Sequence, residues 1–118
     1  MPVSIDIFKD AKKTKEFQPG ETIFEEGSPG DYMYVVLEGE VDILHNEVVI
    51  NRIHEGEIFG EMALIDDSPR SATARASQTT KVALVNRFDF TFYVQHSPFF
   101  ALDILEIMAN RLRANLDR

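Results

Sequence analysis

The chain of 118 residues contains no cysteine. Disulfide bonds and thiolate chemistry are therefore both excluded, and the composition suits a reducing compartment. Long hydrophobic runs are also missing, because the longest, Met33 to Leu37, falls far short of the ~20 residues that span a membrane. The segment from Met1 to Glu16 has no apolar core of signal-peptide length. We expect a soluble, cytoplasmic protein.

Basic residues are scarce as well. The chain has 12 Lys and Arg against 20 Asp and Glu, which gives a formal net charge of −8. A nucleic-acid-binding protein needs a basic face, and an anionic membrane repels an acidic domain, so neither partner is expected. If such a domain binds an anion, it must concentrate positive charge at one place.

The chain also lacks a cluster of metal-binding side chains. Its histidines, His45, His54 and His96, show neither an i, i+2 nor an i, i+4 spacing. Zinc and iron sites use sets of imidazoles, so we expect no metal site and interpret each histidine as a surface or strand-edge residue.

What the sequence does contain, from Thr14 to Val85, is a series of short apolar segments separated by turn signals such as Pro19-Gly20. Many short strands at regular spacing indicate a β-sandwich or jelly-roll barrel. We predict strands at 22–24, 33–37, 41–44, 48–53, 58–59 and 81–85, and a further one where the chain alternates from Ser71 to Ser77. At this length we expect a single domain over 1–118, with the β-roll at about 14–86.

Helices are predicted at the C-terminal end, over about 87–116. The segment Phe88–His96 carries Phe88, Phe92 and Val94 on its apolar side. Ser97 is a good N-cap and Pro98 a good first residue for the next helix, which we expect to end near Leu116. Its apolar stripe follows a heptad spacing through Leu102, Leu105, Ala109, Leu112 and Leu116. This stripe either packs on the roll or forms a dimer seam. Residues 1–13 are expected to be a short helical or extended lead-in anchored by Ile5, Ile7 and Phe8.

The most informative stretch begins at Gly60. A glycine lets the backbone approach a ligand closely, and a helix opening at Glu61 would point free N–H groups outward, which favours phosphate. Arg70 can offer a charged, forked donor to the same phosphate. Glu61 would repel phosphate but can accept a hydrogen bond from a neighbouring sugar hydroxyl. The set therefore suits a phosphorylated sugar.

Each of these residues also has a structural interpretation. Gly60 could serve only a turn, and Glu61 only the start of a helix. Arg70 could pair on the surface with Asp66 or Asp67, a contact worth roughly 0–1 kcal/mol. For any single residue the structural interpretation is preferable, but for the ordered set the binding site is the better hypothesis.

The stretch from Gly56 to Ala76 closely resembles the phosphate-binding cassette of cyclic nucleotide-binding domains. Such domains occur in the catabolite activator protein and in the regulatory subunits of cyclic AMP-dependent protein kinase. The chain meets the pattern F-G-E-[LM]-A-L-I-x-x-x-P-R-[AS]-A-T at every fixed position. A wider resemblance runs over about 14–116, through Gly27-Ser28-Pro29-Gly30-Asp31 and the strands that follow. It implies an eight-stranded β-roll with a short cassette helix and two C-terminal helices.

The resemblance also implies residue roles. Glu61 would hold the ribose 2′-hydroxyl, Arg70 would neutralise the cyclic phosphate, and the amides of Ala63 and Ser71 would complete the phosphate cradle. The predicted ligand-binding residues are Gly60, Glu61, Met62, Ala63, Arg70, Ser71 and Ala72.

Recognition of the base is less fixed by the sequence. Asn115 falls where the catabolite activator has a polar base contact, and an asparagine amide can pair with adenine. The preferred interpretation of Asn115 is a solvated surface residue near a frayed helix end. Ser71 could touch a guanine amino group weakly. Cyclic AMP is the favoured ligand, with cyclic GMP as the alternative, and no other cofactor is expected.

Other functions remain as alternatives. A cupin-like enzyme would share the jelly roll but needs histidine ligands that Phe24-Glu25-Glu26 does not provide. Nucleotide hydrolysis would need a second acid, a metal pair or a nucleophile beside Glu61, so no catalysis is expected. The chain ends where catabolite activator relatives continue into a helix-turn-helix domain. It is therefore expected to be a stand-alone sensor, or else a fragment of a transcription regulator. A second copy through the C-terminal helix, or another protein, would be its partner.

Overall fold

The computed structural model describes residues 13–116, apart from the side chain of Asn115. It contains two four-stranded sheets whose paired strands are all antiparallel. The first sheet is formed, in order, by β1 (Thr14–Phe17), β8 (Thr80–Val85), β3 (Met33–Glu38) and β6 (Ile58–Phe59). The second is formed by β2 (Thr22–Phe24), β7 (Thr73–Ala76), β4 (Glu40–His45) and β5 (Val48–His54).

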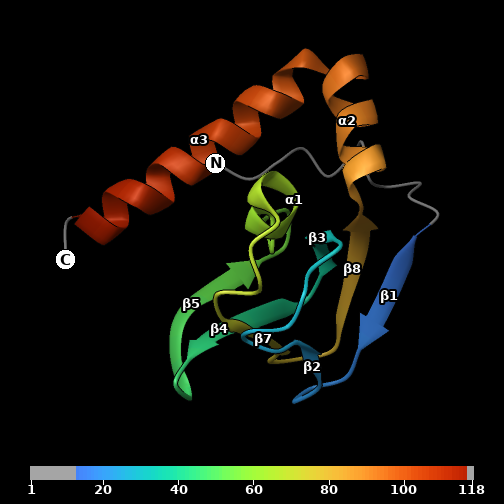
Figure 1. Ribbon diagram of the computed structural model, residues 1–118. Helices are drawn as coiled ribbons and strands as arrows, with labels where there is room; N and C mark the ends of the chain where they lie inside the picture. The colour runs from blue at the N-terminus through green and yellow to red at the C-terminus, as the bar shows by residue number, and fades with distance from the viewer. Residues whose placement is uncertain (1–12, 117–118) are drawn as a thin grey trace.

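Three helices complete the described part of the chain: α1 (Met62–Asp66), α2 (Arg87–His96) and α3 (Pro98–Leu116). Figure 1 shows α2 and α3 on one side of the roll, with α1 between α3 and the strands. The predicted fold class, a mainly β roll with a cassette helix and two C-terminal helices, is confirmed. The lead-in with Ile5, Ile7 and Phe8 lies outside the described residues.

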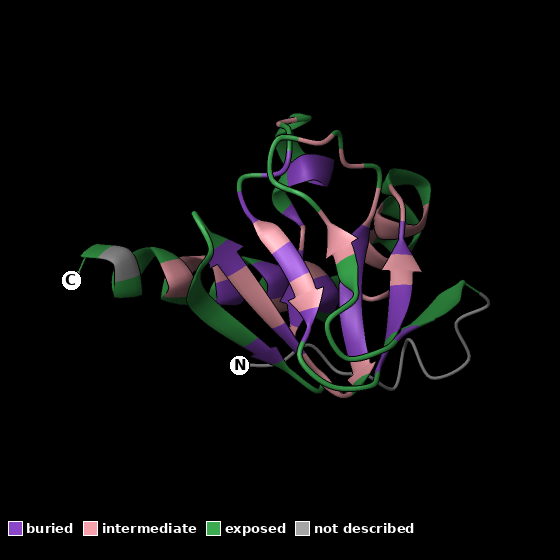
Figure 2. Ribbon diagram, turned by 90° about the horizontal axis from the view of Figure 1, so that it is seen from below, coloured by how far each residue is buried: buried purple, intermediate pink, exposed green. Residues whose placement is uncertain are grey.

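The two sheets pack on each other through alternate side chains of their strands. In β3, Tyr34 and Val36 point into this space, while Met33 and Val35 point to the opposite face. Both faces of β3 are therefore buried, which explains why its sequence is an unbroken apolar run. The inner cluster consists of Phe17, Tyr34, Val36, Val41, Ile53, Phe59, Ala74, Ala76 and Val82. In Figure 2 these buried strands contrast with β5, most of which is exposed.

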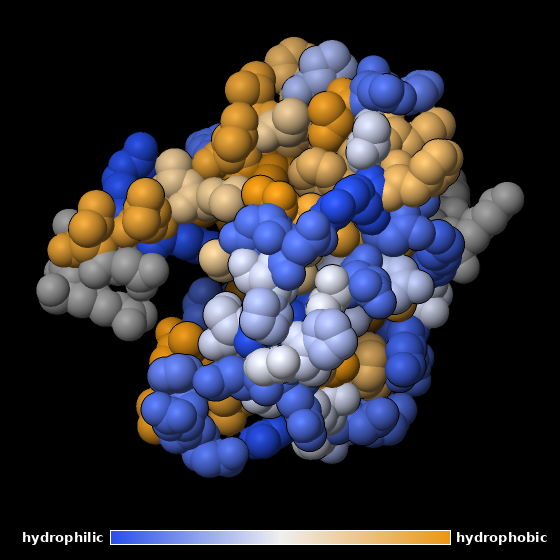
Figure 3. All heavy atoms as spheres, in the orientation of Figure 1, coloured by the Kyte–Doolittle hydropathy of each residue, from blue (hydrophilic) through white to orange (hydrophobic). Residues whose placement is uncertain are grey.

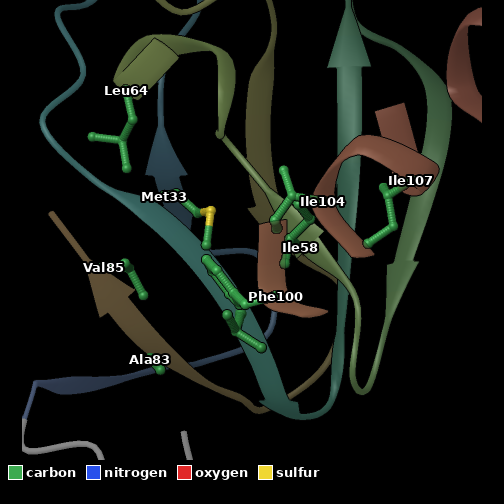
Figure 4. Packing of buried hydrophobic residues seen from close by; sticks show 9 residues of the cluster. Met33, Ile58, Leu64, Ala83, Val85, Phe100, Ile104 and Ile107 are labelled. Atoms are coloured by element: carbon green, nitrogen blue, oxygen red, sulfur yellow. The ribbon is translucent and has the colours of Figure 1, made fainter. Parts of the chain in front are cut away.

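A second core joins the first sheet to the helices. Phe100, Ile104 and Ile107 of α3 pack on Met33, Ile58 and Val85, as Figure 4 shows. Leu64 of α1 belongs to the same cluster. This core fixes α3 over the cassette, because a buried aromatic or aliphatic side chain contributes about 1.5–3 kcal/mol.

The structure corrects the expected apolar side of α2 for Phe88 and Phe92 and confirms it for Val94. Phe88 is 78% exposed and Phe92 is 48% exposed, whereas Phe90, Tyr93 and Val94 pack against the core. The helix begins at Arg87 because Asn86 caps it: its side chain accepts from the Asp89 backbone N–H, and the Asp89 carboxylate accepts from the Asn86 N–H. The cap at Asn86 therefore determines where α2 begins. The position of the first sheet determines which side of the helix is buried.

The heptad stripe of α3 does not pack on the roll. Its leucines are 60–75% exposed, and the residues that face the core belong to a different stripe. This excludes the interpretation that Leu102, Leu105, Leu112 and Leu116 are core residues. Figure 3 shows apolar side chains gathered along α3 and over the corner between α2 and α3.

Candidate functional site

A cavity of about 650 Å³ lies between the cassette, the second sheet and α3. Gly60 and Glu61 follow β6, Arg70 precedes β7, and Arg111 reaches the cavity from α3. Ile50 and Asn51 of β5 contribute to another wall. The cavity therefore joins a polar end at the cassette to a more apolar end between β5 and α3.

The Arg70 side chain is the central charge of this cavity. It is only 6% exposed, and its two Nη atoms donate to the carbonyl oxygens of Gly60 (2.9 Å) and Tyr32 (2.7 Å). Its Nε atom is buried and has no hydrogen-bond partner within the described part of the chain. Among residues 13–116, no carboxylate forms an ion pair with this guanidinium. A buried cation without a counter-ion is costly, and a bound anion would relieve that cost.

Backbone contacts hold Arg70 at this position. Its N–H donates to Ser28 O (2.8 Å), and its carbonyl accepts from Gly27 N (2.7 Å). The loop between β2 and β3 is thus fastened to the cassette on both sides of the arginine. Burial lowers the pKa of the guanidinium, while Tyr34, Asp31 and Glu61 act in the opposite direction. Because an arginine pKa starts so high, the group stays charged.

Two glycines make room for the guanidinium. A Cβ at Gly30 would lie 2.5 Å from Arg70 Cζ, and a Cβ at Gly60 would lie 2.7 Å from its Nη1. Gly60 also has φ +77°, a conformation that side chains other than glycine rarely adopt. The glycine at position 60 is therefore required by both space and backbone geometry.

Glu61 lies next to this site and is also buried, at 6% exposed. Its Oε1 accepts from Arg111 Nη1 at 2.7 Å, and the other terminal nitrogen of Arg111 donates to Ile58 O. Glu61 is the N-cap residue of α1, as the structural interpretation expects, but its side chain makes no capping hydrogen bond to the helix. The carboxylate instead connects the cassette to α3 and lines the cavity.

All the residues predicted to bind ligand line this one cavity: Gly60, Glu61, Met62, Ala63, Arg70, Ser71 and Ala72. The surface pairing of Arg70 with Asp66 or Asp67 does not occur. Asp66 accepts from Ser68, and Asp67 pairs with Arg87. The predicted base contact, Asn115, lies outside the described side chains.

The remaining polar features lie elsewhere. His45 contacts Glu26, His54 contacts Glu40, and His96 stacks on Phe92. A smaller hollow of about 290 Å³ on the outer face of the second sheet is lined by Glu26, Arg75 and other residues. None of the helices between residues 13 and 116 has the length and hydropathy of a membrane span.

Comparison with known families places this geometry in context. The model of the cyclic nucleotide-binding domain matches residues 14–97. The chain belongs to the cyclic nucleotide-binding domain family. The matched region contains the whole roll, the cassette and α2.

Relatives of this cyclic nucleotide-binding domain include protein kinase regulatory subunits and a cyclic nucleotide-dependent protein kinase. The chain is 37% identical over 89 residues to a cAMP-dependent protein kinase regulatory subunit of Hypocrea atroviridis, covering 75% of this chain and 19% of that protein. It is 40% identical over 82 residues to a cGMP-dependent protein kinase of Plasmodium berghei, covering 70% and 10%. The chain thus spans a fifth or less of the length of these curated relatives.

A solved structure supports the same assignment of the domain. The Catabolite Activator Protein of Thermus thermophilus aligns with a TM-score of 0.80 and 31% identity, over 89% of this chain and 52% of that one. The resemblance stated from the cassette alone is therefore confirmed at the level of family and fold.

Several residues that shape this cavity were not predicted from the sequence. Phe24 and Tyr34 flank Arg70, Gly30 makes room for it, and Arg111 pairs with Glu61. Of these residues, Arg111 could have been found from the sequence. Arg111 continues the helical spacing of Phe100, Ile104 and Ile107, so it is a charged residue on the buried face of α3.

Proposed function

We propose that this domain binds a 3′,5′-cyclic purine nucleotide, with cyclic AMP preferred over cyclic GMP, and acts as a ligand-responsive regulatory module. The observation that carries the proposal is the buried guanidinium of Arg70, which among the described residues has two carbonyl partners, an unpaired Nε and no carboxylate. A cyclic phosphate supplies the missing anion, and charge-assisted hydrogen bonds to arginine are among the strongest in proteins.

Glu61 is proposed to bind the ribose. One carboxylate oxygen is occupied by Arg111, and a carboxylate has acceptor sites for further donors. A 2′-hydroxyl beside the phosphate would donate to the free oxygen. The amides of Ala63 and Ser71, which both line the cavity, are proposed to complete the phosphate cradle, as the family's cassette implies.

The preference for cyclic AMP rests on relatives rather than on a base contact. The similar proteins include a regulatory subunit of a cAMP-dependent protein kinase and a cGMP-dependent protein kinase. Regulatory subunits of cAMP-dependent protein kinases are more frequent among these relatives than cGMP-dependent kinases. A nucleotide is the only ligand proposed, without a metal or a second cofactor.

The regulatory part of the proposal depends on α3. Met108, Ala109 and Leu112 line the cavity, and Arg111 is paired with Glu61, so a nucleotide contacts or displaces groups of this helix. Ligand binding would shift the population of α2 and α3 positions, which a partner then senses. We propose binding without turnover, because Glu61, the acid lining this cavity, is engaged in an ion pair.

A second copy of the chain is the proposed partner. Leu102, Leu105, Leu112 and Leu116 form an exposed stripe with heptad spacing, the pattern that two helices use to pack together. Glu106 and Arg113 lie one heptad apart on the same side of this stripe, so in an antiparallel pair each would face the opposite charge of the second copy.

Isothermal titration of the purified chain with cyclic AMP and cyclic GMP tests the proposal, with Arg70→Ala measured alongside. Removing one side of a buried charge pair costs about 2–5 kcal/mol, so the mutant should bind ~30-fold to several thousand-fold more weakly. Arg75→Ala is the matched control, because Arg75 lies on the outer face of β7. Heat from neither nucleotide, or equal affinity of Arg70→Ala and wild type, would refute the assignment.

A further inference from the structure

The Arg70 guanidinium is buried, so contacts within the protein must hold it in place when no anion is bound. Among the described residues its guanidinium has two carbonyl acceptors and an unpaired Nε, and it is almost fully enclosed. Carbonyl oxygens carry only partial negative charge. Asp31 and Glu61 are near enough to act on the cation electrostatically, yet neither is bonded to it.

Two aromatic side chains, Phe24 of β2 and Tyr34 of β3, also act on the guanidinium. Arg70 Cζ lies 4.1 Å from the centroid of the Phe24 ring and 5.7 Å from that of Tyr34. The face of an aromatic ring attracts a cation, most strongly where water is excluded. At the shorter of these distances the guanidinium is in direct contact with the Phe24 ring.

The Phe24 ring is itself held in place. It packs on Tyr34 and Phe59, with ring centroids 5.9 Å and 6.0 Å away, and its strand is paired with β7. Tyr34 and Phe59 stack on each other with centroids 5.0 Å apart. The aromatic group therefore presents one fixed ring face to Arg70.

We propose that Phe24 is a positioning residue of the anion site: its ring face holds Arg70 in the cavity as a cation that no carboxylate neutralises. This inference rests on the proposed function, since it concerns how the same site is prepared for its ligand. Without the ring, the guanidinium is free to turn toward Asp31 or Glu61. An incoming phosphate must then compete for it, and affinity falls although Arg70 is still present.

The first test compares Phe24→Leu with Phe24→Tyr by titration with cyclic AMP. Leucine removes the π face and keeps an apolar side chain, whereas tyrosine keeps the ring. Cation–π contacts are worth about 0.5–2 kcal/mol, so Phe24→Leu should bind ~2- to 30-fold more weakly. Phe24→Tyr should stay within about twofold of wild type, and equal losses in both variants would count against the inference.

A second test separates electrostatics from packing. Mono-, di- and trifluorophenylalanine introduced at position 24 keep the shape of the ring and progressively weaken its negative face. Affinity should fall stepwise along the series. The same substitutions at Phe59 are the matched control, because this ring also lines the cavity and packs on Phe24, whereas the cation–π contacts of Arg70 with described residues are to Phe24 and Tyr34. The Phe59 series should be flat.

The outcomes distinguish this inference from the proposed function. If wild type binds and Arg70→Ala does not, while fluorination at Phe24 leaves affinity unchanged or acts equally at Phe59, the ring only packs and the inference is overturned. If wild type binds neither cyclic nucleotide, the proposed function itself fails. A stepwise loss at Phe24 alone supports both.

Discussion

The cavity has an arginine at each end, and the two differ in whether a carboxylate of the protein pairs with them. At the cassette end, Arg70 is enclosed by strands, contacts neutral carbonyls and a ring face, and has no carboxylate partner among the described residues. At the α3 end, Arg111 is paired with Glu61 and half-buried. A paired arginine has its charge satisfied within the protein, so it acts as a link between elements. An unpaired one keeps its capacity for a ligand anion.

After Arg70→Ala, the largest expected loss of nucleotide affinity is at Glu61, where the two ends of the cavity meet. Glu61→Ala removes a charged acceptor from the ribose, and a hydrogen bond to a charged group is worth about 1.5–3 kcal/mol. Affinity for cyclic AMP should fall ~10- to 150-fold. Titration with 2′-deoxy cyclic AMP is the decisive comparison, because the mutant should no longer distinguish it from the ribonucleotide. A mutant that discriminates as wild type does would remove Glu61 from the ribose site.

A smaller effect is expected when the space around Arg70 is filled. Gly30→Ala places a Cβ 2.5 Å from Arg70 Cζ and 2.7 Å from Ala63 Cβ. Overpacking of this kind costs about 1–3 kcal/mol of stability, and a displaced guanidinium should weaken nucleotide binding by ~10-fold. Thermal denaturation measures the loss of stability, and titration calorimetry measures the loss of affinity.

Gly20→Ala is the control for this substitution. Gly20 has φ +85°, and beyond its chain neighbours no described atom lies within 4 Å of the position that a Cβ would occupy. Alanine there therefore strains the backbone without touching the site. It should lower stability and leave affinity unchanged. If Gly30→Ala also spared affinity, Arg70 would not need its observed position in order to bind.

Arg111→Ala tests the α3 end. Leaving Glu61 buried without its partner is destabilising, and because Arg111 is partly exposed we expect about 1–2 kcal/mol, or a melting temperature lower by roughly 4–15 °C. Nucleotide affinity should change only a few-fold. Arg113→Ala, on the same helix but bonded only to Asn110 among the described residues, should change neither quantity. Equal melting temperatures for the two mutants would show that the pair does not fix α3.

The smallest effect on ligand binding is expected from the exposed stripe. Leu105→Glu should leave the affinity within about twofold, because Leu105 does not line the cavity, but it should shift the chain to a monomer in sedimentation velocity. Phe88→Glu, at an exposed apolar residue of α2, is the control and should leave the mass unchanged. A wild-type chain that is monomeric at high concentration would exclude the second copy as partner.

Much of the fold could be predicted from local sequence. Turn glycines and alternation located most strands closely: the segment predicted at 33–37 is β3 (Met33–Glu38), and 58–59 is β6, whereas β1 (Thr14–Phe17) was not among the predicted segments. The start of α3 at Pro98 followed from the Ser97-Pro98 pair. These signals are local because turn conformation, capping and side-chain period depend on residues only a few positions apart.

Helix faces could not be predicted in the same way. The helix α3 carries two apolar stripes, one with Phe100, Ile104 and Ile107, the other with the exposed leucines. Periodicity describes both equally well. Only the location of Met33, Ile58 and Val85 in the first sheet decides which stripe is buried. The exposed Phe88 and Phe92 of α2 have the same explanation.

The sequence by itself determined the chemistry of the cassette, because Gly60, Glu61 and Arg70 lie within one short stretch whose order and spacing identify the family. Tertiary structure decided what surrounds that chemistry. Phe24 contacts Arg70 from a separate strand, and Arg111 reaches Glu61 from 50 positions along the chain. Contacts between distant segments depend on how sheets and helices pack, and no local pattern specifies them.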